Sequence, residues 1–149
     1  MRNVLAFVLA AGLTGAGCSG GSSNSLPTGT PPPPTPPTAP TPTISSETFA
    51  GTVAVGGVAF HPFTVTLAGG QITIILTAAG PPATIFMGLG VGTIAGDACT
   101  LLPNASVATP AGATAQLTGT ISAGSYCVRV WDIGNQTADV TYAVTVNHY

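Results

Sequence analysis

The stretch that decides the fold is Val-Thr-Tyr-Ala-Val-Thr-Val, residues 140–146, in which every second side chain is large and apolar. A period of two with β-branched and aromatic residues indicates a half-buried β-strand, because successive side chains of a strand point to opposite faces. The same alternation recurs at residues 63–67 and 72–76. The Ala-rich stretch 105–117 is interrupted by Pro110 and Gly112, so we expect no helix there.

Clusters of Gly, Pro and Asn separate these alternating segments into short strands. We expect strands near 47–55, 58–67, 70–78, 84–91, 97–101, 114–121, 125–132 and 139–147. About eight short strands at this spacing predict an all-β fold, a single antiparallel β-sandwich or jelly roll. The predicted domain is residues 46–149.

The N-terminal region has the composition of an export signal followed by a tether. A basic residue, a short apolar run and small residues precede Cys18, and the apolar run is shorter than the roughly 20 residues of a spanning helix. We expect residues 1–17 to be a signal peptide. Residues 18–45, first Gly/Ser-rich and then Pro/Thr-rich, are predicted to be a disordered tether, with a PxxP ligand as the alternative for the proline-rich part.

The residues before Cys18 resemble the lipobox of bacterial lipoproteins, with small residues at the two preceding positions. The sequence departs from that pattern at Gly15, where the family usually has Leu or Val. The resemblance implies lipidation of Cys18, with palmitate among the acyl groups, and hence membrane attachment. Because Ser19 stands where an Asp would favour the inner membrane, the resemblance implies a lipoprotein of the outer membrane.

Charged side chains make up only 4% of the chain, against about 25% in ordinary soluble domains. Without the signal peptide, the sequence contains one basic residue, Arg129, and four acidic residues. A single cation cannot neutralise several phosphates, so this composition excludes nucleic-acid binding. It also leaves few groups for acid–base chemistry. No Gly-x-Ser-x-Gly occurs, and His61 and His148 are far apart in the sequence, so we expect neither an enzyme nor a metal centre.

Cysteine usage predicts one disulfide. If Cys18 carries lipid, Cys99 and Cys127 remain as a pair, and exported proteins meet an oxidising environment. The alternative is a pair of buried free thiols. Alternation within 125–132 places Cys127, Arg129 and Trp131 on one face of a strand, opposite its inward residues, so the disulfide is expected outside the main core.

Trp131 and Arg129 are the main candidates for ligand binding. Residues two apart share a strand face, so the guanidinium can lie on the indole. An exposed Trp on a sandwich face would serve as a platform for sugar stacking or for docking a protein. The alternative is that Trp131 packs under a loop as part of the core.

Two further motifs have both a functional and a structural interpretation. Gly88-x-Gly90-x-Gly92 loosely matches a dinucleotide-binding loop, but no helix pattern follows, so we expect glycines that admit tight sheet packing or a bulge. Asp132, Asn135 and Asp139 could supply oxygens to calcium. The alternative for this segment is hairpin-turn chemistry, with an Asx-turn at Asp132.

Three segments, residues 68–76, 123–130 and 140–146, resemble strands of bacterial pre-peptidase C-terminal (PPC) domains. The resemblance implies a non-catalytic β-sandwich, usually an appendage of secreted enzymes. We expect no cofactor. We expect no catalytic domain beside the predicted sandwich, and the sequence lacks the acidic Asp-x-Asp strand that the family often shows, so the resemblance gives little support to calcium binding. We therefore expect a lipid-anchored envelope protein that binds a glycan or an envelope or secreted protein, or serves a structural role. The alternative is an accessory or inhibitor domain acting on a secreted hydrolase.

Overall fold

The computed structural model describes residues 41–149, so the predicted signal peptide, the lipidation of Cys18 and most of the predicted tether lie outside the described residues. The chain from 41 onward forms eight strands and no helix. They are β1 (Ser45–Val53), β2 (Val58–Val65), β3 (Gly70–Gly80), β4 (Phe86–Ala95), β5 (Ala98–Pro110), β6 (Leu117–Ile121), β7 (Gly124–Trp131) and β8 (Val140–His148). Within this part of the chain no helix is long and apolar enough to span a bilayer.

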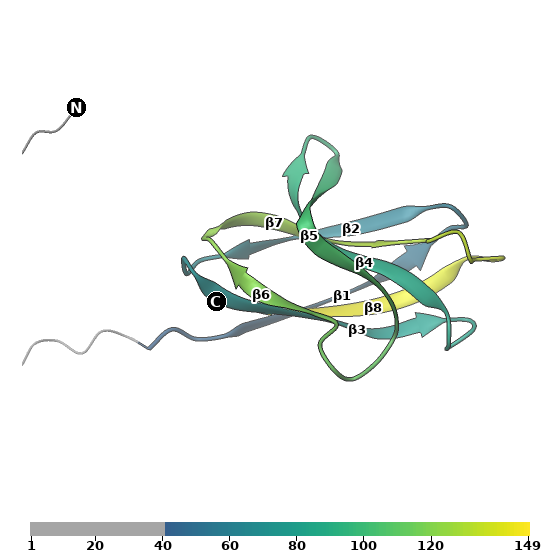
Figure 1. Cartoon of the computed structure of the whole chain (residues 1–149), viewed down its shortest axis with the longest axis horizontal. Helices are drawn as coiled ribbons and strands as arrows, with labels where there is room; N and C mark the ends of the chain where they lie inside the picture. The colour runs from purple at the N-terminus through teal and green to yellow at the C-terminus, as the bar shows by residue number, and fades with distance from the viewer. Residues whose placement is uncertain (1–40) are drawn as a thin grey trace, which may run out of the picture. The chain divides into compact units, whose positions relative to one another are not determined.

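The strands form two four-stranded antiparallel sheets packed face to face, as Figure 1 shows. One sheet has the order β1-β8-β3-β6 and the other β2-β7-β4-β5. The chain passes to the opposite sheet at every connection except the β4–β5 hairpin, which is the winding of a jelly roll. The predicted all-β sandwich is therefore confirmed.

The core lies between the sheets and consists of the alternate residues that the sequence pattern predicts. In β8 the inward residues are those at positions 140, 142, 144 and 146, and all four are buried. In β7, Val128 and Val130 are fully buried in the core while Cys127 lies outside it. Burying a Val or Leu side chain contributes about 1.5–3 kcal/mol, so this inner layer is the main source of stability.

The fifth strand is longer than the sequence predicts, and the sixth is shorter. Pro103 and Asn104 suggested an end to the strand, but they form a bulge, and pairing with β4 resumes beyond it. Residues 102–105 stand opposite Val91 alone, and Asn104 has a φ of 58°. Because a bulge inserts residues without ending the pairing, turn-type residues here do not mark a loop.

Candidate functional site

The candidate site is the outer face of the β2-β7-β4-β5 sheet, which we call the platform, and glycines of β4 shape it. Met87, Leu89 and Val91 of β4 are buried inward, so Gly88 and the next alternate glycines face outward. Across the ladder, Gly88 pairs with Trp131 of β7. At the position that pairs with Trp131, β4 therefore carries no side chain.

The indole of Trp131 packs directly on Gly88. A Cβ added at Gly88 would lie 2.0 Å from Cε2 of the indole and 2.4 Å from Nε1, well inside contact distance. The expectation that Gly88, Gly90 and Gly92 admit close packing is confirmed. A strand, not a helix, carries these glycines, so the geometry of a dinucleotide loop is absent from this segment.

Arg129 lies beside Trp131 on the same face. Its Cζ is 5.3 Å from the centre of the indole ring, within the range of a cation–π interaction. Its Nη1 donates a hydrogen bond to the carbonyl oxygen of Cys99 at 3.4 Å. Trp131 is half-buried and is not part of the inter-sheet core, and its indole lies against the strand at Gly88.

The predicted disulfide joins Cys99 of β5 to Cys127 of β7, with a Cα–Cα distance of 6.0 Å. Both sulfurs are buried at the outer side of the same sheet, outside the inter-sheet core, as the alternation in β7 predicts. The bond ties the β4–β5 hairpin, whose tip projects from the sandwich in Figure 1, to the strand that carries Arg129 and Trp131. It therefore holds one side of the platform in place.

The surroundings of Trp131 are apolar and exposed. Val58 of β2, its ladder partner, is 53% exposed, and Phe86 at the start of β4 is 47% exposed. Phe60 pairs with Arg129 and is half-buried. Apolar side chains of this size in water are normal singly, but a contiguous group is typical of an interaction surface.

The segment after β7 adopts the turn chemistry given above as the alternative to calcium. Asp132 Oδ1 accepts backbone hydrogen bonds from Gly134 at 2.8 Å and Asn135 at 3.1 Å, and Oδ2 accepts one from Gly56 at 2.8 Å. These N–H donors, that of Gly56 first, lower the pKa of the Asp132 carboxyl. Asp139 is exposed and takes no part in these bonds.

The calcium hypothesis gains no ligand set from this arrangement. In residues 41–149, no group of three or more His, Cys, Asp or Glu side chains is placed to hold a metal ion. The amide Nδ2 of Asn135 donates to the carbonyl oxygen of Phe86, so this side chain joins the turn to β4. Of the three residues proposed for calcium, Asp132 and Asn135 thus stabilise the turn through hydrogen bonds.

Both histidines have a side-chain partner on a neighbouring strand. His148 is buried, with Nε2 2.7 Å from Oε1 of Glu47. His61 Nε2 lies 2.7 Å from the Tyr142 hydroxyl, and its ring stacks on Phe49 at 4.9 Å. Burial lowers the pKa of His61 and raises that of Tyr142. The alternation of β1, β2 and β8 could have placed these side chains inward together.

Comparison with family models and with curated proteins gives no match. Among solved structures, the chain is similar to Aeromonas hydrophila PliG, a periplasmic lysozyme inhibitor of g-type lysozyme, with a TM-score of 0.45 and 16% identity over 70% of this chain and 86% of that one. It is also similar to Salmonella Typhimurium PliG, with a TM-score of 0.44 and 13% identity over 70% of this chain and 87% of that one. Because these TM-scores and identities are low, we base the functional proposal on the geometry of the platform.

Proposed function

We propose that this protein is a non-catalytic binding module of the cell envelope that docks a protein partner on the platform. The observation that carries the proposal is Trp131 laid on Gly88 beside Arg129, within an exposed apolar surface. Cores of protein interfaces are enriched in aromatic residues and Arg and depleted in Lys, Glu and Asp. Trp and Arg are also the residues that most often dominate binding energy.

The two ladder positions beside the indole carry no polar side chain, which favours a protein over a glycan. A sugar presents many hydroxyl groups, which need donors and acceptors around the stacking ring once they lose water. The ladder neighbours of Trp131 are Val58 and Gly88, whose side chains provide none. An apolar protein surface needs no such groups, so it fits these two ladder positions better than a sugar does.

Placement in the envelope is part of the proposal. It is supported by the signal-like N-terminus, by the lipobox-like residues before Cys18 and by a disulfide suited to an oxidising compartment. In this arrangement a lipid on Cys18 anchors the chain at the outer membrane and the proline-rich tether displays the sandwich. Mass spectrometry of the native N-terminus tests it: an unmodified Cys18, or cleavage elsewhere, would remove the anchor from the proposal.

The docking proposal is tested by crosslinking the full chain to envelope proteins, followed by affinity measurement with the purified partner. Trp131→Ala is expected to weaken binding at least about 30-fold, the effect of a hot-spot residue worth 2 kcal/mol or more. Ile75→Ala, which truncates a half-buried side chain on the outer face of the other sheet, is the matched control and should leave affinity unchanged. Equal affinity of both variants would exclude the platform as the interface.

The same variants separate the other candidate functions. A glycan array that shows saccharide binding lost in Trp131→Ala would replace the protein partner with a sugar. Inhibition of a secreted hydrolase, also lost in that variant, would favour the accessory or inhibitor function. Both outcomes keep the platform: the first changes its ligand to a sugar, and the second identifies its protein partner as an enzyme.

A further inference from the structure

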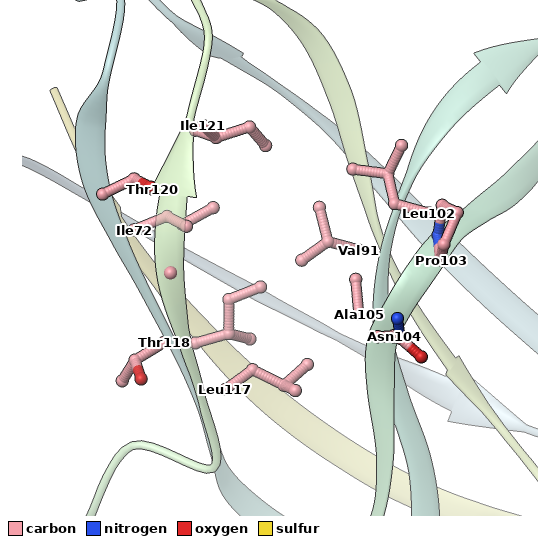
Figure 2. A pocket seen from close by; sticks show the side chains of 12 residues that line it. Ile72, Val91, Leu102, Pro103, Asn104, Ala105, Leu117, Thr118, Thr120 and Ile121 are labelled. Carbon is pink, nitrogen blue, oxygen red and sulfur yellow. The ribbon is translucent and has the colours of Figure 1, made fainter.

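A second feature, separate from the platform, is a hollow at the edge where β5 and β6 face each other across the sandwich. Its volume is about 260 Å³. Figure 2 shows side chains of the two strands facing each other across an open space. It is lined by Ile72, Ile74, Val91, Leu102, Pro103, Asn104, Ala105, Leu117, Thr118, Gly119, Thr120 and Ile121.

Two local features keep this edge open. On one side, the bulge at 102–105 departs from regular pairing with β4 and places Leu102 and Ala105 at the hollow. On the other side, Gly119 sits between Leu117 and Ile121 on the inward face of β6. A Cβ added at Gly119 would meet no atom within 4 Å, so the missing side chain leaves space that its neighbours do not fill.

The lining selects a neutral, apolar occupant. It contains no charged side chain, and it is aliphatic apart from Asn104, since Thr118 and Thr120 point away from the space in Figure 2. An apolar occupant would remove the aliphatic side chains of this lining from water, which is favourable in proportion to the apolar area that it covers. A peptide would bring backbone N–H and C=O groups whose burial is costly without partners. A hydrocarbon chain has no such groups.

We propose that this hollow binds the single hydrocarbon chain of a small neutral amphiphile taken up from solution. The chain would lie between Leu117 and Ile121 on one side and Leu102 and Ala105 on the other. Asn104, at the bulge, is the polar lining side chain left to hydrogen-bond a neutral head group such as a hydroxyl. This site does not depend on the platform, because Trp131 is absent from its lining.

The test uses 1-octanol as the probe, with the full chain labelled at Ile, Leu and Val methyl groups for NMR. Saturable shifts are expected for methyl groups that line the hollow and not for Val58 on the platform. Gly119→Leu should fill the space and weaken octanol binding at least 10-fold. Thr120→Leu places the same side chain on the opposite face of β6 and should bind as the natural protein does.

Further arms define the occupant and the fold of the variants. Octanoate and octylammonium should bind at least 10-fold more weakly than octanol, because the lining offers no counter-charge. If Gly119→Leu does not fold, Gly119→Val serves in its place. Absence of saturable shifts at the lining methyl groups, or unchanged octanol affinity in a folded Gly119 variant, would overturn the proposal.

Discussion

Adding one methyl group at Gly88 is the sharpest test of how the platform is built. In Gly88→Ala the new Cβ would lie 2.0, 2.3 and 2.4 Å from three indole atoms, whereas ordinary contacts begin at 3.4 Å. The ring of Trp131 must therefore lift by roughly 1.4 Å, and overpacking of this kind costs about 1–3 kcal/mol. Because the ring is half-exposed and can move toward solvent, we expect the lower part of this range, about 1–1.5 kcal/mol. Loss of the Arg129 contact adds about 0.5–1 kcal/mol.

The assay follows from the composition, because Trp131 is the only Trp in the chain. Its emission should shift to the red and its quenching by acrylamide should increase in Gly88→Ala. For a domain of this size, the loss in stability lowers Tm by about 4–8 °C per kcal/mol. Gly119→Ala is the control, since its Cβ meets no atom within 4 Å, and it should be as stable as the natural protein or slightly more stable. Unchanged emission, quenching and Tm in Gly88→Ala would refute the packing of the indole on the strand.

Three further predictions concern stability. Replacing Cys99 and Cys127 with Ser opens a link across 28 residues and should lower the free energy of unfolding by about 2–4 kcal/mol in urea titrations, whereas equal midpoints with and without the disulfide would contradict this. Burial lowers the pKa of His61, so the contribution of the neutral imidazole to the free energy of unfolding is present above pH 6.5, its ordinary pKa, and is lost as the pH falls below that value. The free energy of unfolding of His61→Gln should therefore fall less over this pH range. Parallel curves of stability against pH for the two proteins would exclude this effect. Backbone N–H donors lower the pKa of Asp132, so the contribution of its carboxylate to the free energy of unfolding is present above pH 3.8 and is lost as the pH falls further. Asp132→Ala should be less stable than the natural protein at pH 7, and this difference should shrink below pH 3.8. A difference that does not depend on pH would argue against these hydrogen bonds.

The candidate site was partly accessible from the sequence. The spacing of Arg129 and Trp131 predicts that they share a strand face, and the structure places them within cation–π distance. The spacing of the β4 glycines predicts close packing but not what packs there. That Gly88 lies under Trp131 follows from the pairing of β4 with β7, which brings together two residues 43 positions apart in the chain.

What the sequence determined by itself is local. Alternation with period two, as in residues 140–146, established strands and their inward faces, and the compartment implied by export paired Cys99 with Cys127. These properties depend on neighbouring residues and on simple chemistry, so they can be predicted from one chain. The tertiary structure alone decided which strands are neighbours, that β5 continues past its bulge, and that a hollow remains over Gly119. These features depend on how segments that are distant in the sequence pack against one another, and the local sequence pattern of a single segment does not contain this information.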